Sequence, residues 1–168
     1  LFGDFNPAGR LPFSVPRSVG QIPLYYNKKA PQSHDYVEMS ASPLYPFGYG
    51  LSYTSFDYSD LHLSALTPRS FEISFKVRNT GKYDGEEVTQ LYLRDEYASV
   101  VQPLKQLKHF ARFYLKRGEE REVKFILSEE DFSLVDRNLK RIVEPGTFQI
   151  MIGAASDDIR LQTKVEIK

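Results

Sequence analysis

The chain has 168 residues, of which 41% are hydrophobic and 14% aromatic, and this composition excludes wholesale disorder. Its 22 basic and 22 acidic side chains cancel, so its overall charge offers no electrostatic basis for a nucleic-acid partner or an anionic membrane. No apolar run approaches the roughly 18–20 residues of a membrane span, and the absence of cysteine excludes disulfides and cysteine metal sites.

The first third of the chain differs in composition from the rest. Residues 1–58 hold eight charged side chains but seven of the ten prolines and seven of the eleven tyrosines, and they show no sustained periodicity. The other 36 charges lie in residues 59–168, which resemble an ordinary domain with a polar surface. We predict a boundary near Ser55–Ser59, with an irregular Pro/Tyr-rich segment over 1–54 and a domain over 55–168. The opening LFGDFNPAGR, without an initiator methionine, indicates a piece of a longer protein.

The stretch PLYPFGYGLSY, residues 43–53, is uncharged and contains four aromatic rings: Tyr45, Phe47, Tyr49 and Tyr53. Four such side chains represent roughly 600–1,000 Å² of surface. A monomer rarely exposes more than a few hundred Å² of contiguous apolar patch. We therefore predict that these four residues dock against a neighbouring protein surface, and we favour this role over a platform on which sugars stack.

The second region reads as short strands whose apolar residues alternate with a period of two, as in a sheet with one buried face. A first strand is expected at 56–64, and 71–78 alternates without exception, with Phe71, Ile73, Phe75 and Val77 pointing inward. The other predicted strands are 87–95, 104–115, 123–127, 148–152 and 159–167. Their expected inward residues are Leu91 and Leu93; Leu107, Ala111, Phe113 and Leu115; Val123, Phe125 and Leu127; Phe148, Ile150 and Ile152; Ile159, Leu161, Val165 and Ile167.

Turn residues separate these strands, at NTGKYDG, KRGEE and EPGT. One helical turn is expected at SEEDFSLVD, where the Ser128 side chain can cap the backbone N–H of Asp131. About seven short strands in some 110 residues predict an all-β fold, an antiparallel sandwich of immunoglobulin or fibronectin type III character. A small barrel is the alternative.

No catalytic or metal-binding constellation stands out. His34, His62 and His109 are far apart and lack metal-ligand spacing, and we interpret His62 and His109 as edge or solvent-facing strand residues. The pairs Glu86–Glu87, Glu119–Glu120 and Glu129–Glu130 fall at expected turns or a helix start, which is typical of solvated positions and not of two acids facing each other across a substrate. We predict no catalytic residue, no substrate-binding residue, no metal and no cofactor.

Three motifs nevertheless resemble a known family. NPAGRLPFSVPRSVGQIPLYYN, PLYPFGYGLSYTSFDYS and VRNTGKYDGEEVTQLYLRD, in that order, resemble the C-terminal third of glycoside hydrolase family 3, of the β-glucosidase and β-xylosidase type. The resemblance runs from Asn6 to about Ile152. It implies a parent with a (β/α)-barrel, then an α/β sandwich domain, then a fibronectin type III-like domain. Residues 1–54 would be the tail of the α/β domain and the connector, and 55–168 the last domain.

The resemblance also implies a retaining mechanism, in which a carboxylate attacks the anomeric carbon and water later releases the sugar. In the family the nucleophilic aspartate lies on the barrel and the acid/base carboxylate lies upstream of the region matched here. Neither motif matches a position of this chain. The expected partners are thus the upstream catalytic domains and, in the parent, a mono- or oligosaccharide, and a periplasmic or secreted location fits the resemblance.

Two kinds of function follow. The leading hypothesis is a non-catalytic C-terminal structural module of a retaining β-glycosidase, which braces the catalytic domains. The alternatives are a freestanding carbohydrate-binding module, with Tyr45, Tyr49 and Tyr53 as its platform, and a protein-binding sandwich.

Overall fold

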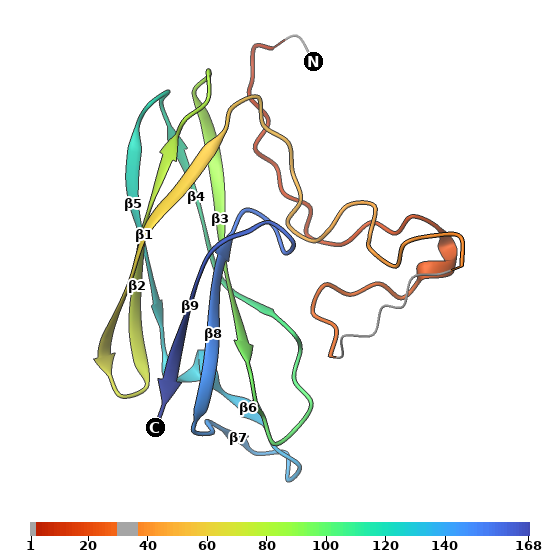
Figure 1. Ribbon diagram of the computed structural model, residues 1–168, viewed down its shortest axis with the longest axis vertical. Helices are drawn as coiled ribbons and strands as arrows, with labels where there is room; N and C mark the ends of the chain where they lie inside the picture. The colour runs from red at the N-terminus through yellow and green to blue at the C-terminus, as the bar shows by residue number, and fades with distance from the viewer. Residues whose placement is uncertain (1–2, 30–36) are drawn as a thin grey trace.

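The computed structural model describes residues 3–29 and 37–168. His34 lies outside these residues, so its predicted role is not addressed. The model is all-β, as predicted, and its long strands form two antiparallel sheets packed face to face (Figure 1). The three-stranded sheet has the order β1 (Phe56–Thr67), β2 (Ser70–Asn79) and β5 (Glu120–Leu127). The four-stranded sheet has the order β4 (Gln106–Leu115), β3 (Gly85–Asp95), β8 (Gly146–Gly153) and β9 (Ile159–Ile167).

Short elements complete the fold. A two-stranded ladder joins β6 (Leu134–Val135) to β7 (Arg141–Ile142), and 3₁₀ turns form η1 (Val19–Gln21) and η2 (Glu129–Phe132). At η2, the predicted helical turn is confirmed, but the capping hydrogen bonds run to Asp131. Its carboxylate accepts the Ser128 backbone N–H at 2.8 Å and the Ser128 hydroxyl at 3.0 Å.

The alternation of the sequence explains the core. In β2, the inward residues Ile73, Phe75 and Val77 are fully buried, and Ile73 lies opposite Phe125 of β5 in the ladder. From the other sheet, Leu91, Leu93, Phe148, Ile150 and Ile152 fill the same layer. Because side chains alternate across a strand, the intervening residues, such as Lys76 and Lys124, face water.

One inward prediction is wrong. A register shift between Leu91 and Tyr92 of β3 changes the phase of β4, so Leu107 lies opposite Tyr92, outside the core. His109 takes the position opposite Leu91, and its ring stacks on Phe125 with centroids 5.9 Å apart. It lies in an edge strand, as expected, but is not solvent-facing; His62 of β1 is exposed, which confirms its interpretation.

Residues 3–29 and 37–54, which we call the arm, form no long strand. The arm projects from the sandwich on the side of the four-stranded sheet (Figure 1). Its first leg, residues 3–16, lies against its second leg, residues 43–54. The Leu11 N–H donates to the Tyr49 carbonyl at 2.9 Å, the Gly48 N–H to the Leu11 carbonyl at 2.8 Å, and Val15 bridges to Tyr45. The two legs therefore hold each other, and together they approach the sandwich.

Candidate functional site

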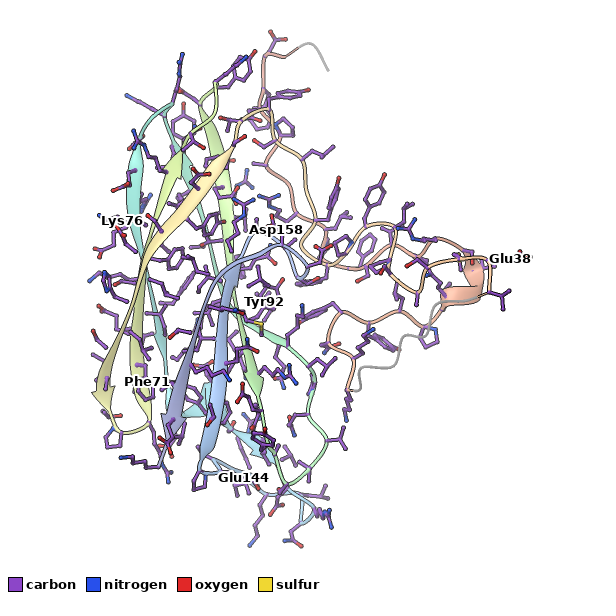
Figure 2. The ribbon with its side chains drawn as sticks, in the orientation of Figure 1. Glu38, Phe71, Lys76, Tyr92, Glu144 and Asp158 are labelled. Carbon is purple, nitrogen blue, oxygen red and sulfur yellow. The ribbon has the colours of Figure 1, made fainter. Side chains whose placement is uncertain are left out.

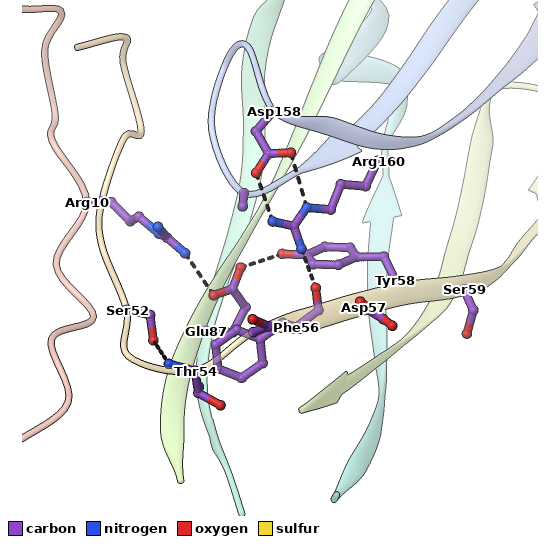
Figure 3. Close-up of a pocket in the computed structure, with 13 residues that line it drawn as sticks. Arg10, Ser52, Thr54, Phe56, Asp57, Tyr58, Ser59, Glu87, Asp158 and Arg160 are labelled. Atoms are coloured by element: carbon purple, nitrogen blue, oxygen red, sulfur yellow. Dashed lines mark hydrogen bonds and ion pairs between the residues drawn. The ribbon is translucent and has the colours of Figure 1, made fainter. Parts of the chain in front are cut away.

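The junction between the arm and the sandwich contains a buried charged cluster built around Glu87 (Figure 3). Glu87 lies in β3 in phase with Leu91 and Leu93, so its carboxylate faces the space between the sheets, and only 1% of the residue is exposed. The interpretation of Glu87 as a solvated turn residue is therefore wrong. Glu86, its neighbour, points the other way and pairs with Arg112 at the surface.

Two groups satisfy the Glu87 carboxylate. Nη2 of Arg10, from the first leg of the arm, lies 2.8 Å from Oε2, and the Tyr58 hydroxyl of β1 donates to Oε1 at 2.7 Å. The Arg10 side chain is itself only 16% exposed, so the ion pair is largely removed from water. One carboxylate thus joins the arm to both sheets of the sandwich.

Burial dominates the acid–base properties of this cluster. Desolvation raises the pKa of Glu87 above its ordinary value, although the charges of Arg10 and Arg160 and the Tyr58 hydrogen bond act in the opposite direction. Desolvation, with the adjacent Glu87 charge, also raises the pKa of Tyr58 well above 10.0. Tyr58 therefore stays protonated at neutral pH and serves as the hydrogen-bond donor.

Arg160 of β9 extends the cluster. It pairs with Asp158 at 2.8 Å, donates to the Phe56 carbonyl, and places its guanidinium 4.9 Å from the centre of the Tyr58 ring. A guanidinium over a tyrosine ring is a favourable cation–π arrangement. Arg160 thus fixes the ring whose hydroxyl binds Glu87.

A cavity of about 760 Å³ lies beside the cluster and is lined by residues of both the arm and the sandwich. Arg10, Tyr58, Glu87 and Arg160 contribute to its wall. Two carboxylates of the wall, Glu87 and Asp158, are engaged by guanidinium groups. Their arrangement is that of a structural junction in which opposite charges compensate each other.

Two glycines of the sequence FGYG allow the arm to approach the sandwich closely. Gly48 has φ +82°, and a Cβ there would lie 2.4 Å from Oε1 of Gln90 on the outer face of β3. At Gly50, a Cβ would lie 2.1 Å from the Gly9 carbonyl oxygen and 2.9 Å from Nη1 of Arg10. A side chain at either position would displace the contacts on which the junction depends.

A second contact covers the outer face of the four-stranded sheet. Tyr92 of β3 is fully buried, lies on the side of the sandwich that faces the arm (Figure 2), and donates its hydroxyl to Gln90 at 2.5 Å. Tyr26 of the arm packs edge-on against Tyr92, with ring centroids 6.2 Å apart. The Ser156 N–H donates to the Phe47 carbonyl at 2.9 Å, so the arm also binds the loop between β8 and β9.

The four aromatic residues predicted to dock do not form one surface. Phe47 stacks on Tyr26 with centroids 4.1 Å apart, and therefore packs within this chain. Tyr45 and Tyr49 contact each other at 4.9 Å, and Tyr45 is 40% exposed. Tyr53 lies apart and is 53% exposed.

Sequence reasoning missed Arg10, Tyr58, Glu87 and Arg160. A signal for Glu87 was present, because Leu91 and Leu93 are expected inward and Glu87 has the same parity in the strand. Nothing local to Arg10 or Arg160 predicts their contacts, since they lie 150 residues apart in sequence and meet only through the fold.

Two further searches cover the described residues. Over residues 3–29 and 37–168, no group of three or more His, Cys, Asp or Glu side chains could hold a metal ion. In the same part of the chain, no helix has both the length and the apolar character that would let it cross a membrane.

The fold and the junction define a fibronectin type III-like sandwich joined to an extended arm, and two family models match these parts. The model of the glycosyl hydrolase family 3 C-terminal domain matches residues 1–53, and that of the fibronectin type III-like domain matches residues 87–156. The chain belongs to glycoside hydrolase family 3 and corresponds to the C-terminal part of its longer members.

Individual relatives agree with this assignment. The chain is 44% identical to a β-xylosidase of Formosa agariphila and 44% identical to a periplasmic β-glucosidase of Salmonella typhimurium. Each match covers 95% of this chain but 23% of the relative. A crystal structure of a mutant β-glucosidase from Listeria innocua in complex with laminaribiose superimposes with a TM-score of 0.90 at 36% identity, over 99% of this chain and 25% of that one.

Proposed function

We propose that this chain is the non-catalytic C-terminal structural module of a retaining β-glycosidase, a β-glucosidase or β-xylosidase that releases terminal β-linked sugars. The observation that supports it most directly is that nearly the whole chain aligns with about a quarter of relatives that carry those names. In this proposal the reacting carboxylates belong to upstream domains, and the module braces those domains.

The arm supplies the docking surface in this proposal. Large hydrophobic side chains that remain exposed are concentrated in it, although the arm is less than a third of the chain. They are Phe5, Phe13, Val19, Ile22, Tyr25, Val37, Leu44, Tyr45, Leu51 and Tyr53. Clustered apolar exposure of this kind is typical of a surface that another protein covers. We assign Tyr45 and Tyr53 to direct contact with the upstream domains, and Phe47 and Tyr49 to the support of that surface.

Two measurements test the proposal. The purified chain should not hydrolyse aryl β-glucosides or β-xylosides, and turnover by the chain alone would refute the non-catalytic role. The chain should also bind the upstream domains of its parent when they are produced separately. Exchange of Tyr45, Leu51 and Tyr53 for serine should weaken that binding, whereas serine at Leu66 and Ile126, which are exposed on the sandwich, should not.

One observation favours the carbohydrate-binding alternative. Tyr53 and Tyr83 line a cavity of about 620 Å³ together with Asp4, Asn6 and Asp84, a combination of aromatic and polar groups that suits a sugar. Titration with gluco- and xylo-oligosaccharides distinguishes the two functions. Saturable binding that Tyr53→Ala abolishes would support the alternative, and no binding at millimolar sugar would remove it.

A further inference from the structure

The contact between the two parts of the molecule depends on few charged groups. In the described part of the chain, Arg10 is the only residue of the first leg that forms an ion pair with the sandwich. The other leg reaches the sandwich through backbone carbonyls, such as that of Phe47. We propose that the Glu87 cluster is an internal receptor for the Arg10 side chain, and that its role is to fix the direction of the arm rather than to stabilise the fold.

The geometry of the receptor restricts how Arg10 can enter it. The guanidinium must pass Gly50 of the second leg, where a Cβ would lie 3.0 Å from Cδ of Arg10. It then meets a carboxylate whose second oxygen is already held by Tyr58. The pair can form only when both legs lie in the observed direction, and any other placement of the arm leaves Glu87 unpaired.

The energetics of buried pairs support a role in orientation. Removing two charges from water costs free energy that their attraction repays only in part, so a matched apolar pair is often as stable as the ion pair. Burial also raises the pKa of Glu87 in spite of Arg10, which indicates that the attraction does not fully offset desolvation. An apolar pair, however, lacks the directional hydrogen bonds that select one placement of the arm.

Paired spin labels can measure the direction of the arm in the whole chain. The chain has no cysteine, so Val19→Cys and Leu66→Cys would place one label on the arm and one on the sandwich, at sites that are 87% and 53% exposed. The labels would be compared in the parent chain and in the double variant Arg10→Met/Glu87→Met. The control is Lys124→Met/Glu72→Met, which removes an exposed ion pair on the three-stranded sheet.

The parent and the control should each give one narrow distance distribution. The Arg10→Met/Glu87→Met variant should lose it and give a broad distribution, while its melting temperature stays within about 4 °C of the parent, the shift expected for roughly 1 kcal/mol. A narrow distribution in this variant would overturn the proposal. Loss of its strand signal in circular dichroism would also overturn it, since the pair would then be required for the fold. The outcome concerns this chain alone and does not depend on the proposed function.

Discussion

At the scale of single residues, Glu87 determines how the charges of the junction behave. A carboxylate at a core-facing strand position is tolerated because Arg10 and Tyr58 occupy its two oxygens. Removing one member of such a buried pair leaves the other charge without compensation, and this costs far more than the pair contributes. The single variants at this site should therefore differ sharply from the double variant.

Arg10→Met should lower the free energy of unfolding by about 3–5 kcal/mol, because Glu87 would remain buried without a cation. Urea denaturation followed by circular dichroism measures the change. Arg137→Met is the control, since Arg137 is exposed, and it should stay within about 0.5 kcal/mol of the parent. A loss of similar size in both variants would mean that the Arg10 pair has no special role.

The pH dependence of stability should report the Glu87 carboxyl. Its folded pKa is raised above 4.5, so the folded state holds this proton more tightly than the unfolded chain does. The resulting stability is fully present below about pH 4.5 and is lost as the pH rises through the folded pKa. The groups facing Glu87 are Arg10, Tyr58 and Arg160.

Glu87→Gln lacks this titration and retains the others. The parent should therefore gain stability relative to Glu87→Gln as the pH falls from 7 toward 4.5, measured as the difference between their free energies of unfolding at each pH. A difference that is constant with pH, or that grows as the pH rises, would contradict the raised pKa.

At the scale of elements, the strands could be predicted because each carries its own signal. The alternation in FEISFKVR places Phe71, Ile73 and Phe75 inward, and β2 confirms it. Leu107 was misplaced because a register shift in the β3–β4 ladder reverses the phase of β4, and pattern alone does not reveal such a shift.

The legs of the arm could not be predicted, since their conformation depends on contacts between residues distant in sequence. Leu11 binds Tyr49, and Gly48 approaches Gln90, without any periodicity to announce either contact. The aromatic content of residues 43–53 indicated burial correctly for Phe47, but it could not show that the ring's partner is Tyr26 of the same chain.

The close approach of the legs can be tested at Gly50. Gly50→Ala should loosen the arm, because its Cβ would meet the Gly9 carbonyl oxygen and Arg10. Hydrogen exchange at the Leu11 and Gly48 amides, which bond across the legs, should become faster. Gly9→Ala is the control, since no atom lies within 4 Å of the added methyl group. Unchanged exchange in Gly50→Ala would show that the legs can separate there without cost.

At the scale of the whole molecule, two kinds of order coexist. The sandwich is held by continuous strand ladders around a fully buried layer, whereas the arm relies on isolated hydrogen bonds and ring contacts. Local opening is easiest where buried contacts and ladders are sparse.

Hydrogen exchange of the whole chain should therefore separate into two classes. Amides in β2 and β3, the central strands, should exchange slowest, and those of residues 17–29 and 37–44 should exchange fastest. Mass spectrometry of peptic fragments measures both. If the two parts exchanged at the same rate, the arm and the sandwich would open as one cooperative unit.

The cover that the arm provides over Tyr92 and Gln90 has a practical consequence for dissecting this protein. A shortened chain that starts near Ser55 would follow the composition of the sequence, yet it would strip Tyr26, Phe47 and Gly48 from the four-stranded sheet. It would also leave Glu87 without its arginine. Such a trimmed chain would present a newly wetted aromatic face beside an uncompensated acid, so poor solubility of that product would reflect the cut and not an inherent weakness of the sandwich.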